Sequence, residues 1–323
     1  MVIPVAGGRS TIRRTIKISP VHVRDVSLNL AMLGCEDQPP YGPAESTASL
    51  FLELMCSAIV SSSKSHDPTL VESDSAGIDF EVAITIYRAT LQDYPANDEE
   101  WDSYDGVLLP GSFSSACDKD DWIELLKQVI QVEIHKKGRK ALGVCFGHQV
   151  YSHSFHGGLA APCPAGTQAG RRSCIPTKEC IALLKPEDDA IDLLYTHGDM
   201  VQSLPMCAVP LFGNEKVQIQ AAAYFSTEHE ASEYRSGCTS SAQDVHTLPE
   251  PYAFTFQAHP EYTSDLGFNR TFRDVALALE KRGDVPSSQI EMARIDANEN
   301  FDLLERFSVG IIVSVGRTLG WFA

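Results

Sequence analysis

Gly143-Val144-Cys145-Phe146-Gly147-His148-Gln149 is the stretch around which the rest of the chain is organised. A short, largely apolar segment (140–142) leads into it, and residues 150–156 continue it up to a pair of glycines. This order predicts a strand, a sharp turn and a short helix, because small residues two positions before and after Cys145 let the backbone turn tightly. A thiol in such a turn faces the unpaired N–H groups at the helix start, which favour the reactive thiolate. The pattern predicts a nucleophilic Cys145; the alternative is a buried cysteine in an ordinary strand-to-helix turn.

The composition is that of a soluble globular protein, with 43% hydrophobic and 21% charged residues among 323. The net charge of −17 argues against nucleic acid or an anionic membrane as the main partner. The apolar runs are far too short to span a membrane. The nine cysteines form no C-x-x-C pair, so neither a disulfide framework nor a zinc ribbon is expected, and a reducing, cytoplasmic setting fits best.

The first 24 residues differ from the rest, since they contain basic side chains and no acid. A mitochondrial transit peptide is one interpretation of such a start. Prolines and glycines interrupt any amphipathic helix there, so we expect residues 1–24 to form a disordered basic tail. Residues 25–323 are expected to form one domain.

Strand and helix patterns alternate before Cys145, which predicts an α/β fold with a doubly wound, mostly parallel sheet flanked by helices. Further short β patterns follow and predict a small additional antiparallel portion, before helical patterns close the chain. Such sheets place their functional sites at the carboxyl ends of the strands. The expected strands are 26–33, 80–87, 105–109, 191–196, 208–212, 217–225 and 252–258, and the expected helices are 45–60, 122–134 and those after about residue 264.

A polar stretch, Ser226–Glu250, interrupts the second half and is expected to be an insertion. A loop of that length inside a compact domain is either functional or disordered. Because it directly precedes the strand expected at 252–258, we place it at the rim of the site. It either docks a partner or flanks an open cleft.

His259-Pro260-Glu261 follows that same strand and supplies the remaining groups that a thiolate nucleophile needs. An imidazole takes the thiol's proton and later protonates the leaving amine. A carboxylate two residues on holds the other imidazole nitrogen and fixes its tautomer. Cys145, His259 and Glu261 are therefore a candidate catalytic triad; the alternative for His-x-Glu is a solvated strand end.

With these motifs in order, the chain resembles the class I glutamine amidotransferase family, whose fold is flavodoxin-like, from about residue 26 to the C-terminal helices. It is most similar to stand-alone members, including the γ-glutamyl peptidases. The matching stretches are 143–149, 257–262, 105–112, 121–123, 157–158 and 196–199.

The resemblance implies Cys145 as nucleophile, His259 as acid and base, and Glu261 as the group that orients the imidazole. It implies an oxyanion hole made by the backbone N–H groups of Gly111 and Phe146. It also implies a substrate pocket lined by Gln149, Gly198 and Asp199. Asp199 would hold a free α-amino group, although a helix-capping aspartate is an alternative interpretation.

No cofactor is expected, and no metal site, because His148, His153 and His156 do not share one face of their helix. One departure from the family is the stretch 165–170, which lacks the acidic residue usual there.

The expected activity is hydrolysis of the γ-amide of glutamine through a glutamyl thioester, with the ammonia delivered to a separate acceptor enzyme of the synthetase type. The alternatives are a stand-alone γ-glutamyl peptidase acting on glutathione-like conjugates and a catalytically silent scaffold.

Overall fold

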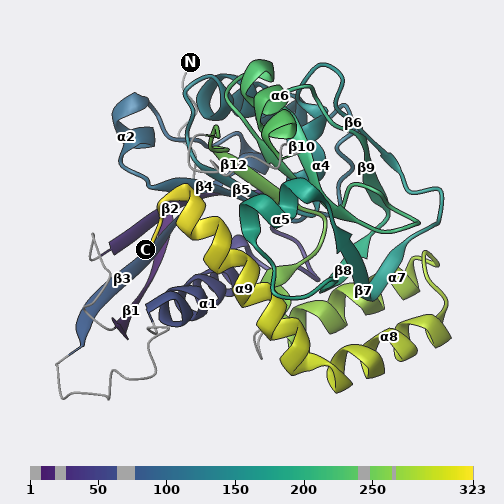
Figure 1. Ribbon diagram of the computed structural model, residues 1–323. Helices are drawn as coiled ribbons and strands as arrows, with labels where there is room; N and C mark the ends of the chain where they lie inside the picture. The colour runs from purple at the N-terminus through teal and green to yellow at the C-terminus, as the bar shows by residue number, and fades with distance from the viewer. Residues whose placement is uncertain (1–8, 19–26, 64–76, 239–247, 264–266, 323) are drawn as a thin grey trace, which may run out of the picture.

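The computed structural model describes residues 9–18, 27–63, 77–238, 248–263 and 267–322, and its centre is a ten-stranded sheet (Figure 1). The strand order is β1-β3-β2-β4-β5-β12-β11-β10-β7-β8, and β6 and β9 form a separate antiparallel pair. The strands are β1 (Ser10–Ile18), β2 (Ser27–Gly34), β3 (Ile78–Arg88), β4 (Gly106–Leu109), β5 (Ala141–Val144), β6 (Leu159–Pro162), β7 (Gln168–Pro176), β8 (Ile191–His197), β9 (Asp199–Ser203), β10 (Ala208–Gly213), β11 (Ala221–Tyr224) and β12 (Ala253–Phe256).

Five neighbouring strands, from β3 through β2, β4 and β5 to β12, run parallel, and antiparallel strands continue the sheet on both sides. The fold class predicted from the sequence is therefore confirmed. The α-helices are α1 (Ala44–Ser63), α2 (Asp98–Asp102), α3 (Asp121–Val129), α4 (Phe146–His153), α5 (Lys178–Leu184), α6 (Glu228–Gly237), α7 (Arg273–Lys281), α8 (Ser287–Glu299) and α9 (Phe301–Leu319). Short 3-10 helices are η2 (Ala89–Leu91) and η5 (Pro260–Thr263), and π-helices are η3 (Ile130–His135) and η6 (Gly267–Phe272).

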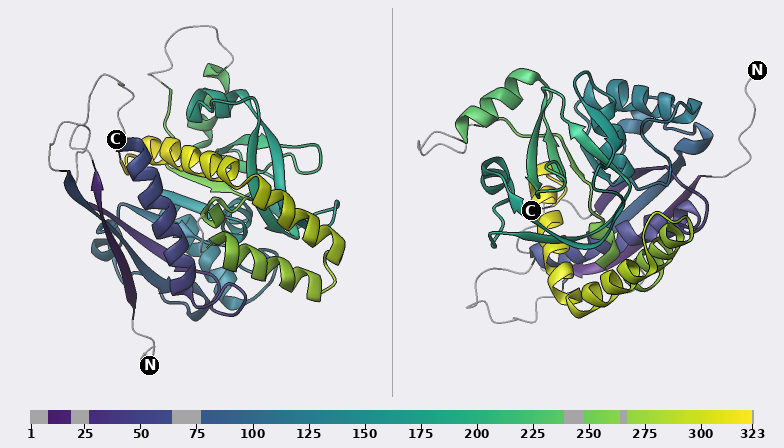
Figure 2. Two further views of the ribbon diagram at one scale, coloured as in Figure 1. Left: turned by 90° about the horizontal axis from the view of Figure 1, so that it is seen from below. Right: turned by 90° about the vertical axis from the view of Figure 1, so that its right-hand side faces the viewer.

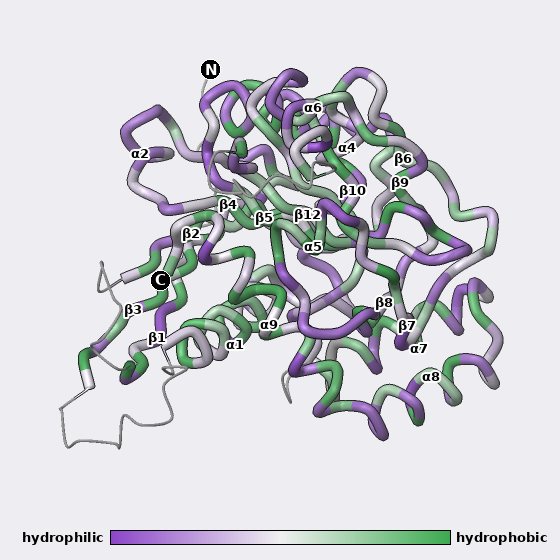
Figure 3. Tube along the Cα trace, in the orientation of Figure 1, coloured by the Kyte–Doolittle hydropathy of each residue, from purple (hydrophilic) through white to green (hydrophobic). Residues whose placement is uncertain are grey.

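Helices cover both faces of the sheet because its central strands are apolar on both sides. Along β2, Leu30 and Met32 pack toward α1, α5 and α9, whereas Ala31 and Leu33 pack toward α3 and α4. Figure 2 shows α1 and α9 side by side across one face, and Figure 3 shows the hydrophobic residues gathered along the central strands. The C-terminal helices α7 and α8 form a third apolar cluster.

Strand β1 corrects the expectation for the N-terminus, because Ser10–Ile18 is no disordered tail but an edge strand paired with β3 along its length. Its isoleucines pack on the core, while Arg13 and Lys17 pair with Glu81 and Asp79 of β3. Residues 1–8 and 19–26 lie outside the described residues.

The expectation that Ser226–Glu250 is a loop at the rim of the site is also wrong for the part described. Residues 228–237 form α6, whose Thr227 cap is a complete capping box and whose Tyr234 is buried. The helix lies where β11 ends and β12 begins, at what we call the amino edge of the sheet. Cys145 and His259 lie at the other, carboxyl edge, where β5 and β12 end. Residues 239–247 lie outside the described residues.

Helix α1 is long and apolar enough to cross a membrane by length and composition alone. Within the fold, however, 61% of that window is buried. It packs between the sheet and α9, so its apolar surface is accounted for by the core.

Candidate active site

Cys145 lies in a strained turn between β5 and α4, as the glycine spacing predicted. Its backbone has φ +52° and ψ −107°, a conformation that side chains rarely adopt. The turn is anchored by the Cys145 amide, which donates to the carbonyl oxygen of Phe256 at 2.7 Å. A side chain at Gly147 would overlap the carbonyl oxygen of Leu109 on β4. Only glycine therefore lets α4 approach the sheet closely enough to leave Cys145 at the carboxyl edge.

His259 and Glu261 follow β12 and form a buried pair, with His259 Nδ1 2.7 Å from Glu261 Oε1. The imidazole is stacked on the Tyr262 ring, with centroids 4.2 Å apart and planes at 6°. Its second nitrogen, Nε2, has no hydrogen-bond partner among the described residues. Burial works to lower the pKa of His259, but the charges of Glu261 and Cys145 outweigh it and raise the pKa to about 10. This arrangement favours a protonated His259.

Gly111 lies beside the side chains of Cys145 and His259. A Cβ atom there would be 3.1 Å from His259 Cε1 and 3.5 Å from Cys145 Cβ. Phe146 is the first residue of α4, so its amide has no partner within the helix. The structure thus brings together the two residues expected to form the oxyanion hole, next to Cys145.

The three residues expected to bind substrate also gather at the carboxyl edge. Gln149, one turn after Cys145, donates from Nε2 to the Asp199 carbonyl at 2.8 Å and to Gln257 Oε1 at 3.2 Å. Asp199 begins β9 and so caps no helix; its half-exposed carboxylate accepts a hydrogen bond from Ser115. Gly198 lies beside Thr167, whose Oγ1 is 3.5 Å from the Gly198 Cβ position.

The stretch 165–170 builds its turn without an acidic side chain. Gln168 is buried, and its Nε2 donates to the carbonyl oxygens of Ala165 and Gly166. Gln168 pairs with His197 across β7 and β8, so this turn borders the site.

Four residues near Cys145 were not predicted as site residues from the sequence. Each has a buried polar atom that has no hydrogen-bond partner among the described residues. Burial lowers the pKa of His197 to about 4, which keeps its ring neutral. All four residues with such an atom lie within stretches quoted for the family resemblance. A fifth residue, Tyr41, follows β2 in a Pro-Pro-Tyr-Gly turn, also at the carboxyl edge, and only its spatial neighbours reveal it. The unpartnered atoms belong to Thr196, His197, Gln257 and Tyr262.

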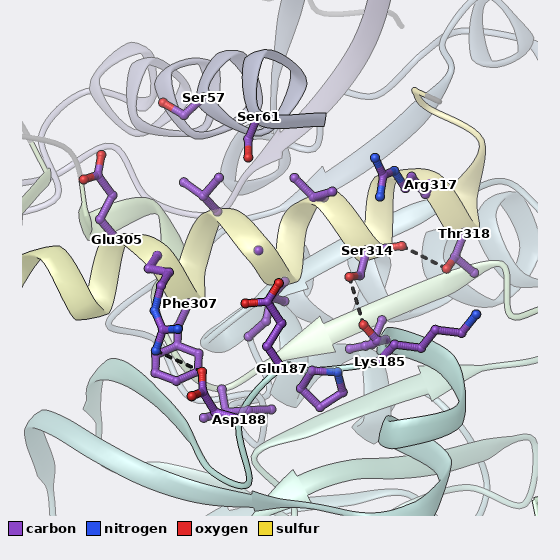
Figure 4. A pocket seen from close by; sticks show the side chains of 18 of the residues that line it. Ser57, Ser61, Lys185, Glu187, Asp188, Glu305, Phe307, Ser314, Arg317 and Thr318 are labelled. Atoms are coloured by element: carbon purple, nitrogen blue, oxygen red, sulfur yellow. Dashed lines mark hydrogen bonds and ion pairs between the residues drawn. The ribbon is translucent and has the colours of Figure 1, made fainter. Parts of the chain in front are cut away.

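A separate pocket of about 950 Å³ lies between α1, α9 and the segment 183–191 (Figure 4). Glu305 and Ser61 line it from two helices, and Asp188 lines it from the segment below, paired with Arg306. None of the expected catalytic residues lines this pocket. Among the described residues, no group of three or more His, Cys, Asp or Glu side chains is placed to hold a metal ion.

Comparison with known proteins places the chain in a family. The family model for glutamine amidotransferase class-I matches residues 74–278, which contain Cys145, His259 and Glu261. The chain therefore belongs to the class I glutamine amidotransferase family.

Two curated relatives come from Arabidopsis thaliana. Gamma-glutamyl peptidase 5 is 25% identical over 234 residues, 70% of this chain and 81% of the relative. Gamma-glutamyl peptidase 3 is 27% identical over 218 residues, 65% of this chain and 76% of the relative.

Solved structures share the fold. A glutamine amidotransferase from Thermotoga maritima aligns with a TM-score of 0.57 at 16% identity, covering 91% of this chain and 99% of that one. A glutamine amidotransferase from Methylobacillus flagellatus aligns with a TM-score of 0.55 at 14% identity, covering 92% and 96%.

Proposed function

We propose that this chain hydrolyses γ-glutamyl amide bonds in γ-glutamyl peptides, with Cys145, His259 and Glu261 as its catalytic triad. The observation that carries the proposal is that Cys145, whose backbone is strained, lies at the start of a helix beside the buried His259–Glu261 pair. The names of the curated relatives support a peptide leaving group ahead of ammonia. This reverses the order of preference drawn from the sequence.

In the first half-reaction, the Cys145 thiolate attacks the γ-carbonyl carbon. The negative charge that develops on the oxygen is met by the amides of Gly111 and Phe146, and each such donor contributes roughly 3 kcal/mol to the transition state. The imidazolium of His259 then gives its proton to the leaving nitrogen as the C–N bond breaks. A glutamyl thioester on Cys145 and a free amine result.

In the second half-reaction, the now neutral His259 takes a proton from water, whose oxygen attacks the thioester carbonyl. Glutamate leaves as the C–S bond breaks, and the thiolate–imidazolium pair is restored. Glu261 keeps Nδ1 occupied throughout, so Nε2 faces the reacting atoms.

Recognition of the glutamyl end is assigned to the opposite side of Cys145. The Asp199 carboxylate would form an ion pair with a free α-ammonium group. The Gln149 side chain donates a hydrogen bond to the Asp199 carbonyl oxygen and so holds this backbone in place. Ser115 fixes the carboxylate through its hydroxyl.

The test is purified protein offered glutathione and glutamine side by side, with release of glutamate, free amine and ammonia followed. We expect glutamate from both, with the higher kcat/KM for glutathione. A clear preference for glutamine would instead support the amidotransferase activity, and ammonia channelling to a partner enzyme would become the next question. Inactivity on both, with the protein folded, would support a silent scaffold.

A further inference from the structure

Tyr41 approaches the catalytic centre from a part of the chain that the family model does not cover. It lies in the loop between β2 and α1, whereas the match begins at residue 74. Its side chain is buried, and its ring packs edge-on against Phe113 with centroids 4.9 Å apart. Phe113 follows Gly111 closely in the chain, so Tyr41 is fixed against the segment expected to form the oxyanion hole.

The Tyr41 hydroxyl points to the same place as the catalytic imidazole. It lies 3.6 Å from the Cβ position of Gly111, and His259 Cε1 lies 3.1 Å from that position. Cys145 contributes to the electrostatic environment of the hydroxyl, as do its neighbours Thr196 and Tyr262. The hydroxyl is therefore among the polar groups nearest to the reacting atoms.

Two of its neighbours are buried hydroxyl groups that interact with the Tyr41 hydroxyl. Thr196 Oγ1 and the Tyr262 hydroxyl have no hydrogen-bond partner among the described residues, although both side chains are at most 4% exposed. Burying a hydroxyl without a partner costs stability. The hydroxyls of Tyr41, Thr196 and Tyr262 therefore form one buried polar cluster, with which a polar atom of a bound molecule can form hydrogen bonds.

Glu36 ties the Tyr41 loop to the Gly111 segment. One carboxylate oxygen accepts from the amides of Asp37 and Gln38, at 3.1 and 3.0 Å. The other accepts from Ser112 Oγ and from the Phe113 amide, both at 3.5 Å. The Glu36 carboxylate thus connects the two loops, and this connection helps to fix the position of Tyr41.

The reaction itself decides which part of the substrate meets Tyr41. His259 must protonate the leaving nitrogen, so the group attached to that nitrogen lies beside His259. The glutamyl end is assigned to Gln149 and Asp199 on α4 and β9. Tyr41 therefore faces the leaving group.

We propose that the Tyr41 hydroxyl is a specificity determinant, donating a hydrogen bond to the carbonyl or carboxylate oxygen of the amino acid attached through its nitrogen to the γ-glutamyl group. The inference rests on the proposed γ-glutamyl hydrolysis and names its leaving-group subsite. Burial raises the pKa of Tyr41 well above its usual value, so the phenol stays protonated and acts as a donor. Ammonia, the leaving group of glutamine, carries no such oxygen.

The experiment compares the wild type with Tyr41→Phe on γ-glutamylglycine and on glutamine. Phenylalanine keeps the ring against Phe113 and removes only the hydroxyl. One neutral hydrogen bond corresponds to about a fivefold change, so we expect kcat/KM for γ-glutamylglycine to fall about fivefold, mainly through KM. For glutamine we expect kcat/KM to stay within about twofold of wild type. Tyr234→Phe is the matched control, because it removes a hydroxyl from α6 at the amino edge.

Each other outcome decides the question. An equal loss on both substrates, or a shifted pH profile with glutamine, would overturn the inference and make Tyr41 a residue that positions His259. No loss on either substrate would also overturn it. A folded wild type that cleaves neither substrate would refute the proposed function itself, which is a different result from cleavage insensitive to Tyr41.

Discussion

The two ends of strand β12 are built on opposite principles. At its carboxyl edge Cys145 has a strained backbone, and His259, Glu261, Tyr262 and Thr196 each keep a buried polar atom without a partner among the described residues. At its amino edge the polar groups have partners: Arg235 donates to the carbonyl oxygens of Met206 and Ala208, and the capping box of α6 is complete. The Tyr252 hydroxyl is within hydrogen-bond distance of His135 and Tyr151. The Tyr224 hydroxyl is an exception, because it has no hydrogen-bond partner among the described residues. Strain and free polar groups therefore mark where chemistry is expected, and satisfied groups mark where the fold is held together.

The sharpest test of this contrast removes the thiol. Cys145→Ala should lower hydrolysis by on the order of 10⁴-fold or more, since no nucleophile remains. Its melting temperature should stay within about 3 °C of wild type, because Ala keeps the same strained backbone. Cys145→Gly should be equally inactive but more stable than Cys145→Ala by about 1 kcal/mol, because glycine relieves the positive φ. Equal stabilities, measured by urea unfolding, would show that the turn carries no strain.

Labelling checks the same residue by another route. A diazo or chloroketone analogue of glutamine should modify the protein once, at Cys145, because Cys145 is the cysteine whose charge acts on His259. Peptide mass spectrometry reads the position. Modification of Cys117 instead would contradict the assignment.

The next largest effects should come from His259 and Glu261, in that order. His259→Ala removes the group that makes both proton transfers and should lower kcat roughly 10³-fold. Glu261→Gln weakens only the bond that orients the imidazole ring and should lower kcat roughly 10- to 100-fold. Steady-state kinetics measures both. Similar rates for Glu261→Gln and wild type would mean that stacking on Tyr262 alone orients the imidazole.

The same pair predicts a pH dependence. The pKa of His259 is raised from 6.5 to about 10 in the folded protein, so the pair's contribution to stability is full below pH 6.5 and is lost as the pH rises toward about 10. The gap in unfolding free energy between wild type and Glu261→Gln should therefore narrow over that range. Over the same range kcat/KM should stay nearly constant and should fall only as the pH approaches about 10. A gap that widens with rising pH would contradict a charged His259.

Gly111→Ala should have an intermediate effect on activity. The added Cβ would lie 3.1 Å from His259 Cε1, tighter than ordinary contact, and would crowd the space facing Cys145. We expect kcat/KM to fall roughly tenfold or more, because misplacing catalytic groups by a few tenths of an ångström is costly. Gly138→Ala is a control for a glycine with open space around it, although its φ of +63° adds strain. Unchanged activity of Gly111→Ala would show that the added Cβ disturbs neither His259 nor the bound substrate.

The smallest effect on activity should come from the amino edge. Thr227→Ala removes the cap of α6 and should cost about 1 kcal/mol of unfolding free energy. Its kcat/KM on both substrates should match wild type, because α6 lies at the other end of β12 from His259. A loss of activity without a loss of stability would give this edge a role in catalysis.

Features that depend on local spacing could be predicted from the sequence. The glycines around Cys145, the His-x-Glu after an apolar run and the alternation of strands with helices are each encoded within a few residues. These patterns predicted the parallel core and placed three candidate catalytic residues at one edge of one sheet. The strands β6, β7 and β9 and the helix α5 were not predicted, because their short stretches mix polar and apolar residues without a clear period.

Features that depend on partners far away in the chain became visible only in the folded structure. The alternation of Ile12, Ile16 and Ile18 is that of a strand, but β1 exists because β3 supplies hydrogen bonds and acids some 70 positions later. The polar stretch 228–237 forms the helix α6 because Ala231 and Tyr234 are buried when the helix packs beside Phe225 and β10. Tyr41 comes close to Gly111 and His259 because its ring packs on Phe113 and because Glu36 joins its loop to the Gly111 segment. Such contacts form between residues that no local window contains, so they follow from the packed fold and not from the pattern of any one segment.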